Sequence, residues 1–422
     1  MHIDTMLDNE SVRRHLERTT RSWLGLPVSA PVDVPQLPCR LAARLLRVEE
    51  YEQSHRDRWG CWEFSFCASH RRGKLWDPEI DRWVAATRAG LSATTALEPL
   101  WPKGREFAVC LTHDVDMVAR RATPAQALRS VRAASKSSSA LELAQRVTRA
   151  AGRAARYGIS RRPSIDRTLA EAMAIERDLG VCASYLFALH CESLDALDCV
   201  YRATDACAVH GRARTIADVV RMVRDSGFDV GLHGSYRSAT NADVLRREKQ
   251  ELEAIVGGPV VSTRQHYLHF EISTTPAVHE QVGLRADSSL GFNRSVGFRA
   301  GTSLPFWHFD LRARRSLDVL EIPLIVQESP LLSTAALELD GDTALAIVRS
   351  LLDSVASVGG VFTFLIHPHN IANPQFLTIF RGTIEYGLQR GAWFASLRDI
   401  DRWWREREAA LLGSAQTALA VP

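Results

Sequence analysis

From residue 106 onward, short apolar runs alternate with longer helical patterns, and this alternation limits the fold more than any other feature. The first run, EFAVCLT at 106–112, is continuously apolar, which is typical of a strand buried on both faces of a sheet. We expect eight strands, at 106–112, 183–189, 228–232, 260–264, 283–287, 319–323, 361–366 and 392–395. We expect helices between them, at 166–179, 215–225, 241–255, 342–355, 374–390 and 396–411. This alternation predicts an α/β fold with parallel strands.

The chain changes in character near residue 100. Residues 1–100 are rich in arginine and tryptophan and contain strand-like fragments such as CWEFSF at 61–66, so we expect a small N-terminal α/β accessory region there. Residues 101–412 carry the alternating pattern and form the main domain, followed by a tail at 413–422. The alternation is interrupted once, by a basic insertion at about 119–162.

The composition excludes several classes of protein. Hydrophobic residues make up 46% and charged residues 24% of the chain, which is typical of a globular protein with a sizeable core. The net charge of +3 does not indicate a nucleic-acid partner. No apolar run approaches the ~18 residues of a membrane span, and the polar start is unlike a signal peptide. The eight cysteines form no CxxC pair, so we expect a reduced, cytoplasmic protein.

The basic insertion leaves two interpretations open. It holds eleven basic residues against one acid, Glu142. Arg146, Arg149, Arg153 and Arg156 are spaced three, four and three residues apart, so they share one face of a helix. That face is either simply solvated or binds an anionic partner, such as a phosphorylated sugar donor, a lipid-linked precursor or an acidic membrane surface.

Side chains that can bind metals or transfer protons follow five of the predicted strands. These segments are Thr112–Asp116, His233–Arg237, Arg264–His269, Asp287 and His367–Asn370. The carboxyl ends of parallel strands meet at one edge of a sheet or barrel, so we expect these segments to form one site. Imidazole and carboxylate are ligands of divalent transition metals, and a hydrolytic site needs three protein ligands and an open position. The pattern therefore predicts a metal-dependent hydrolase.

The same segments carry a family resemblance. The motifs THDVD (112–116), GLHGSY (231–236), an arginine motif at 264, ADSSLGF (286–292) and LIHPHN (365–370) occur in this order. In that order they resemble the motifs of NodB-homology polysaccharide deacetylases, carbohydrate esterase family 4, over about residues 105–408. The resemblance implies a distorted (β/α)7–8 barrel and metal-dependent removal of acetyl groups from sugars.

The resemblance also implies roles for individual residues. Asp114 corresponds to the catalytic base, Arg264 to the residue that orients the base, and His367 to the general acid. Asp116 and His233 correspond to two metal ligands. The metal is one divalent transition ion, with Zn²⁺ expected first and Mn²⁺, Co²⁺, Ni²⁺ or Fe²⁺ as alternatives.

One position departs from the family pattern. The family's second motif is His-x-x-x-His, but Arg237 stands where the second histidine belongs, and arginine cannot ligate a cation. The third motif usually reads Arg-x-Pro, whereas here His266 occupies the proline position after Arg264. We therefore expect His266 to be the third metal ligand, as in a branch of the family with Arg-Gln-His-Tyr-Leu.

Further residues are candidates for substrate contact. Tyr236 and Tyr267 could stack on a sugar ring, and Asp287 corresponds to the family's mid-barrel aspartate. Arg299, in GFRAG at 297–301, could bind a substrate oxygen or form a structural salt bridge. His269 and His369 are spare imidazoles near the expected site.

Together these features predict a hydrolase that removes an acetyl group from an N-acetylated sugar of a glycan or glycan precursor. Two alternatives stay open: a C–N hydrolase of the same fold acting on a non-sugar amide, and a non-catalytic glycan-binding protein. The presence of Asp114, Arg264 and His367 argues against the second alternative, because binding alone needs no proton-transfer residues.

Overall fold

The computed structural model describes residues 9–57, 59–119, 121–134, 158–161, 164–189 and 197–413, with isolated positions between 140 and 152. The four arginines of the predicted basic stripe, Arg146, Arg149, Arg153 and Arg156, lie outside these described residues, as does most of the predicted tail. No helix within the described part is long and apolar enough to cross a membrane.

One curled sheet of mostly parallel strands organises the molecule. Its strand order in the described residues is β10-β11-β1-β2-β5-β6-β7-β9-β8, and β12 also pairs with β1. All pairs are parallel except β8 with β9. The strands are β1 (Ala108–Val115), β2 (Ala183–Phe187), β5 (Asp229–Gly234), β6 (Ser262–Gln265), β7 (Ala286–Asp287), β8 (Phe306–Asp310), β9 (Arg315–Glu321), β10 (Val326–Gln327), β11 (Val361–Leu365) and β12 (Trp393–Phe394). This open half-barrel confirms the predicted α/β class.

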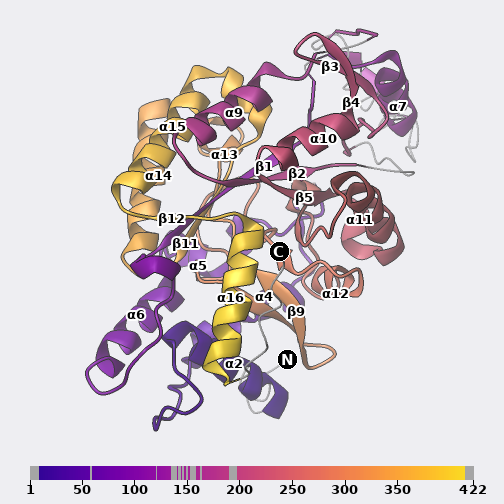
Figure 1. Cartoon of the computed structure of the whole chain (residues 1–422). Coiled ribbons are helices and arrows are strands. Elements are labelled where there is room, and N and C mark those ends of the chain that lie inside the picture. The colour runs from indigo at the N-terminus through magenta and orange to yellow at the C-terminus, as the bar shows by residue number, and fades with distance from the viewer. Residues whose placement is uncertain are drawn as a thin grey trace.

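Helices surround the sheet, as Figure 1 shows, with α14 and α15 on one side and α10, α11 and α12 on the other. Two of them begin at capping boxes, Thr215 with Asp218 and Ser396 with Asp399, which satisfy backbone N–H groups of the first turn. All eight predicted strands and six predicted helices are present. The six are α9 (Arg167–Asp178), α10 (Ile216–Asp225), α11 (Ala242–Val256), α14 (Gly341–Ala356), α15 (Pro374–Gln389) and α16 (Leu397–Leu411). Three further helices in the described part of the main domain were not predicted: α7 (Pro124–Ala134), α12 (Thr275–Gln281) and α13 (Ser329–Leu332).

The described part of the N-terminal region is helical, so the predicted α/β region is wrong there. It contains α2 (Glu10–Leu24), α3 (Cys39–Leu45), α4 (Val48–Glu52), α5 (Ala68–Arg71) and α6 (Glu79–Leu91). The strand-like fragment CWEFSF instead forms a short 3-10 turn at Phe64–Phe66. Its aromatic side chains pack on one another rather than along a sheet edge. The Trp62 ring lies edge-on to the Phe66 ring, with 5.6 Å between the ring centroids.

The N-terminal helices share a core with the sheet. Trp23 of α2, Trp101 and Trp404 of α16 are fully buried within one apolar cluster that also contains residues of β1 and β11. The Trp101 and Trp404 rings lie 5.7 Å apart. The N-terminal region is thus packed as part of the same structural unit.

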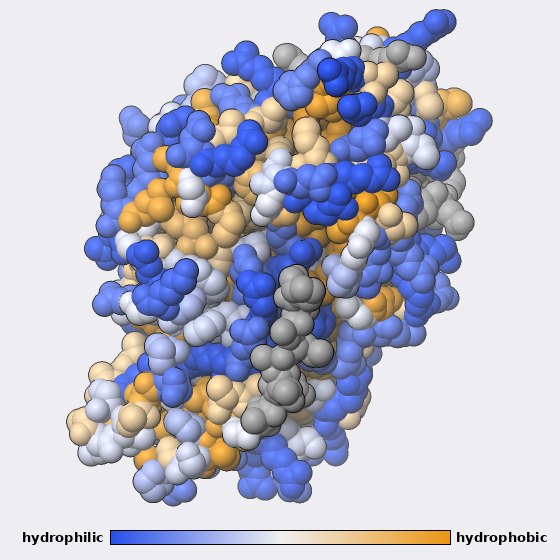
Figure 2. All heavy atoms as spheres, viewed as in Figure 1, coloured by the Kyte–Doolittle hydropathy of each residue, from blue (hydrophilic) through white to orange (hydrophobic). Residues whose placement is uncertain are grey.

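Figure 2 shows that apolar side chains on the viewed face gather in separate patches between hydrophilic ones.

Candidate active site

The predicted site residues lie at the carboxyl ends of neighbouring parallel strands. Asp114 is near the end of β1, His233 lies in β5 and Arg264 in β6, where His233 and Arg264 are direct register partners. His367 lies two residues beyond the end of β11. The sheet geometry therefore brings together side chains that are up to 253 residues apart (367 − 114 = 253).

Asp114, His233 and His367 line a cavity of about 260 Å³. This volume is close to the lower end of the range for small-molecule sites. The lining residues are Trp59, Asp114, Asp116, His233, His266, Tyr267, Leu268, Asn293, Gln327, Ser329, His367, His369 and Asn370.

Asp114 is held by a buried arginine. Its Oδ1 accepts a hydrogen bond of 2.9 Å from Nη1 of Arg264, and the two side chains are 4% and 0% exposed. Arg264 also donates to Thr112 Oγ1 and to both oxygens of Ser288. The guanidinium is thus fixed on several sides, and it fixes the carboxylate of Asp114 in turn.

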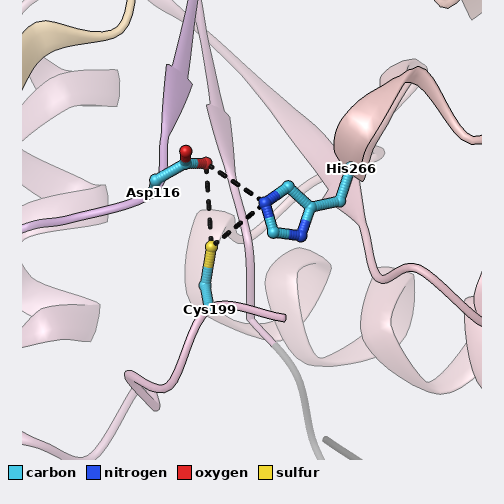
Figure 3. Close-up of side chains that lie close together, drawn as sticks. All are labelled: Asp116, Cys199 and His266. Carbon is cyan, nitrogen blue, oxygen red and sulfur yellow. Dashed lines mark hydrogen bonds and ion pairs between the residues drawn. The ribbon is translucent and has the colours of Figure 1, made fainter. Parts of the chain in front are cut away.

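Three predicted metal ligands converge. Asp116 Oδ1 lies 3.5 Å from His233 Nε2 and 3.8 Å from His266 Nε2. His233 Nδ1 donates to the carbonyl of Arg264 at 2.9 Å, which aims its buried Nε2 at the cluster. Cys199 joins the group: its thiol lies 3.7 Å from Asp116 Oδ1 and 4.0 Å from His266 Nε2, as Figure 3 shows.

This donor set fits a divalent transition ion. Bonds of about 2.0–2.2 Å place tetrahedral donors roughly 3.3–3.5 Å apart, close to the separations around Asp116. His233 Nε2 is buried without a hydrogen bond, which a cation would satisfy. Two imidazoles, a carboxylate and a nearby sulfur favour Zn²⁺ or a similar ion over Mg²⁺. Arg237, which replaces the family's second histidine, is exposed and does not line the cavity.

The predicted general acid, His367, has a buried partner. Its Nδ1 lies 2.7 Å from Glu328 Oε1, and its Nε2 lies 3.7 Å from Asp116 Oδ2. Asn370 donates to the same Glu328 oxygen at 2.6 Å. Burial alone would lower the pKa of His367, but the Glu328 carboxylate outweighs it and raises the pKa to about 10. This imidazole is thereby kept protonated at neutral pH.

Asp116 is kept ionised by its neighbours. Burial would raise its pKa, but the imidazole of His233, 3.5 Å away, and the charges of His367 and His266 hold that pKa well below its usual range. An ionised carboxylate at this point is the form that binds a cation.

Several residues at the site were missed by the sequence interpretation, among them Cys199, Asp198, Glu328 and Trp59. Cys199 and Asp198 lie in the loop after β2, and Asp198 Oδ1 is 3.6 Å from His266 Nδ1. Glu328 follows the two-residue strand β10, so a carboxylate at a strand end was the available signal. Trp59 comes from the N-terminal region and carried no signal that linked it to the site.

The two candidate tyrosines differ in position. Tyr267 lines the cavity and adopts a left-handed backbone, with φ of 60°, which is uncommon for a residue with a side chain. Tyr236 does not line it, so its predicted contact with substrate is corrected: its ring stacks on His269 at 4.0 Å. Its hydroxyl donates to the carbonyl of Trp59 at 2.6 Å. Tyr236 supports the cavity wall from behind. His369, by contrast, lines the cavity.

Two further predicted substrate contacts are also corrected. Arg299 is 1% exposed and forms a two-bond ion pair with Glu50 at 2.9 and 2.8 Å. Of the two alternatives for Arg299, substrate contact or structural salt bridge, the structure therefore has the salt bridge. Asp287 is fully buried and lies beside His279 and His308, away from the cavity lining. Both were misjudged because a polar motif does not reveal that its side chain is buried.

The buried pair of Arg299 and Glu50 leads to a prediction on stability. Arg47 also pairs with Glu50, so Glu50→Ala leaves two buried guanidiniums without a carboxylate. We expect the free energy of unfolding to fall by about 3–5 kcal/mol, measured by urea unfolding. Glu17→Ala, at an exposed pair with Arg21, is the control and should change little. A loss in Glu50→Ala no larger than in the control would contradict this.

The same pair gives a pH dependence. Burial would raise the pKa of Glu50, but Arg299 and Arg47 lower it from 4.5 to about 2. Because the folded-state pKa is the lower one, the stabilisation is fully present above 4.5 and is lost as the pH falls toward 2.

Comparisons with known proteins identify several solved structures that resemble this chain. No family model matches the sequence, and no curated protein matches it. A Mycobacterium smegmatis structure described as a polysaccharide deacetylase is 18% identical, covers 78% of this chain and 99% of its own, and has a TM-score of 0.49. A Pseudomonas aeruginosa PAO1 structure described in the same way is 14% identical, with coverages of 74% and 95% and a TM-score of 0.49. The Puue allantoinase is 14% identical, with coverages of 75% and 95% and a TM-score of 0.47. The chain is thus similar in structure, over most of its length, to polysaccharide deacetylases and to an allantoinase.

Proposed function

We propose that this protein is a metal-dependent hydrolase that removes the acetyl group from an N-acetylated sugar of a glycan or glycan precursor. One observation carries the proposal. A carboxylate fixed by arginine, Asp114, and an imidazole fixed by a carboxylate, His367, both face the donor cluster around Asp116 in a single cavity. That is the pairing of base and acid that amide hydrolysis requires.

The contacts of the metal ligands, the base and the acid support a role for each side chain. Asp116, His233 and His266 would hold the ion, which supplies Lewis-acid polarisation of the acetyl carbonyl and acidifies water. Asp114 takes the proton from the attacking water, with its Oδ1 held by Arg264. His367 donates a proton from Nε2 to the departing amine, because Glu328 keeps Nδ1 occupied and the ring protonated.

The cavity wall favours an uncharged sugar ring. Among the described lining residues there is no arginine or lysine to bind an anionic group. The Trp59 and Tyr267 rings lie 6.1 Å apart at the wall, and aromatic faces pack well against the apolar face of a sugar. Asn293, Gln327 and Asn370 add amides that can bind hydroxyls.

Trp59 is held against the rim by backbone contacts. Its N–H donates to Asp57, its carbonyl accepts from Tyr236, and Gly60 has φ of 72° with the Tyr236 hydroxyl 2.7 Å from where a Cβ would stand. Trp59→Ala keeps these contacts and removes the ring. We expect KM for an acetylated sugar to rise about two- to tenfold with kcat little changed. Trp76→Ala, at an exposed tryptophan outside the cavity, should not alter KM, and an unchanged KM in Trp59→Ala would contradict the stacking role.

The activity itself is tested by acetate release. Protein loaded with Zn²⁺, Mn²⁺, Co²⁺ or Ni²⁺ is incubated with N-acetylated mono- and oligosaccharides, with allantoin and a linear acetamide as separate arms. Release of acetate from a sugar supports the proposal. Turnover confined to the other amides would favour the C–N hydrolase of the same fold. Sugar binding without turnover in any arm would favour a glycan-binding protein.

We propose that the protein is cytoplasmic, which is supported by eight cysteines without a CxxC pair.

The basic insertion supports a separate proposal about a partner. We propose that its stripe contacts an anionic partner through Arg146, Arg149, Arg153 and Arg156. Each basic residue near an anionic bilayer contributes about 1 kcal/mol, so replacing all four by glutamine should weaken salt-sensitive binding to anionic vesicles. Unchanged co-sedimentation with vesicles at low salt would leave the stripe a solvated face.

A further inference from the structure

A second group of buried titratable side chains lies outside the cavity. It consists of Asp287 of β7, His308 of β8 and Glu321 of β9, with His279 of α12 beside them. All four residues are at most 2% exposed. None of them lines the active-site cavity, and the proposed reaction uses none of them. We define these four residues as the inner cluster.

The sheet itself assembles the inner cluster. Asp287 and Glu321 are direct register partners on parallel strands. A register irregularity between Trp307 and Phe309 interrupts the pairing of β8 with β9 at His308. Such bulges re-aim a side chain, and here the imidazole of His308 comes to Glu321. Two carboxylates side by side on a buried sheet repel each other unless positive charge separates them.

The separations suit a bound cation. His308 Nε2 lies 3.1 Å from Glu321 Oε2 and 4.0 Å from Asp287 Oδ2, and one ligand atom from each of the three lies within 4.8 Å of the others. Asp287 Oδ2 and His279 Nδ1 are 3.3 Å apart, so these two buried atoms pair with each other. Neither has a hydrogen bond to another described group, so a cation beside Asp287 Oδ2 would supply a further partner.

In the described part of the chain, no arginine or lysine forms an ion pair with either carboxylate. The partners of Asp287 and Glu321 are histidines, serine and backbone, and Arg299 and Arg264 act on Glu321 only from beyond ion-pair distance. With neutral imidazoles and both carboxyls ionised, the cluster would carry two negative charges, a state that burial and the charge of Asp287 oppose by raising the pKa of Glu321. One divalent cation would balance that charge, whereas otherwise protons must do so.

We propose that the inner cluster is a second metal site, which binds one divalent transition ion of the Zn²⁺, Mn²⁺ or Fe²⁺ class. Asp287, His308 and Glu321 supply the donors, and His279 pairs with Asp287 from the other side. Carboxylate and imidazole together are the donor types that these ions prefer. Complete burial leaves no route for a substrate, so the ion is structural.

The site has a physical connection to the proposed base. Ser289 donates to Asp287 Oδ1 at 2.5 Å and accepts from the backbone N–H of Gln265 at 3.0 Å. The preceding residue, Ser288, holds Arg264, which holds Asp114. An ion at Asp287 therefore fixes the turn that positions Arg264.

The experiment counts metal ions in the full chain by elemental analysis. Asp116→Ala removes a donor from the active site only, so this variant should keep the ion of the inner cluster. His308→Phe removes a donor from the inner cluster, and the ring can pack beside Phe270 and Phe306. It should lose one ion relative to wild type, and the double variant should hold none. If Asp116→Ala keeps one ion, the inner cluster binds metal whether or not the protein releases acetate. This result therefore tests the inner cluster separately from the proposed function.

Controls keep the result interpretable. His15→Phe replaces another buried histidine, whose Nδ1 contacts the Ser316 hydroxyl and whose ring packs on Phe309, and it should retain both ions. If His308→Phe does not fold, Glu321→Gln and a Co²⁺ titration of folded Asp116→Ala replace it, with the visible absorption of bound Co²⁺ as readout. A folded Asp116→Ala chain that binds no ion and shows no Co²⁺ absorption would overturn the proposal, and the inner cluster would then hold protons only.

Discussion

His266→Ala should lose the ion held with Asp116 and His233. His266 Nε2 is 3.8 Å from Asp116 Oδ1, and exposed Arg237 does not line the cavity to replace it. Removing one of three ligands weakens binding more than the 10- to 100-fold typical of an outer partner, so we expect affinity to fall by more than about 100-fold and deacetylation to fall with it. The measurement is Co²⁺ or Zn²⁺ titration of the chelated variant.

The matched control is His269→Ala. This imidazole lies three residues further along the chain and stacks on Tyr236, but it does not line the cavity. It should keep full metal affinity. If His266→Ala also kept full affinity, the substituted-ligand hypothesis would be wrong, and His369, which lines the cavity, would be the next donor to remove.

The sequence predicted the framework because the central strands are buried on both faces. Every residue of β1 and of β11 is buried, and such strands appear as continuous apolar runs. Some of the missed elements are short or unusual, whereas the missed N-terminal helices α2 and α6 are long. β3 (Ala206–Val209) and β4 (Arg212–Thr215) turn through His210 and Gly211, both with positive φ, rather than through the Asn-Gly that such turns favour. β10 has only two residues, too few for any periodicity.

The site was predictable as far as its residues follow strands, and less so beyond that. The ends of β1, β5, β6 and β11 supply the side chains that the structure brings together. Glu328 and Cys199 reach their partners across 39 and 83 residues, through a very short strand and a loop. Their roles depend on tertiary packing, which leaves no local pattern. Arg299 shows the converse: its motif is prominent, but its partner Glu50 lies 249 residues away in the N-terminal region.

Asp114→Asn should keep the active-site ion and lose catalysis. The amide has the shape of the carboxylate and its oxygen can still accept from Arg264, but it cannot take a proton from water. A positioned general base contributes about 10²–10⁴-fold, so kcat for acetate release should fall by that factor. Asp116, His233 and His266 are unchanged, so metal content should match wild type.

The main risk in this variant is stability rather than metal binding. Arg264 is fully buried, and Asp114 is the carboxylate that pairs with it, so the substitution leaves a buried guanidinium uncompensated. Thermal unfolding with and without Zn²⁺ therefore accompanies the kinetics. Asp116→Asn is the matched comparison: it changes a neighbouring aspartate in the same way, yet should lose both the ion and the activity. If metal-loaded, folded Asp114→Asn released acetate as fast as wild type, Asp114 would not be the base, and the proton would have to leave the attacking water by another group in the cavity.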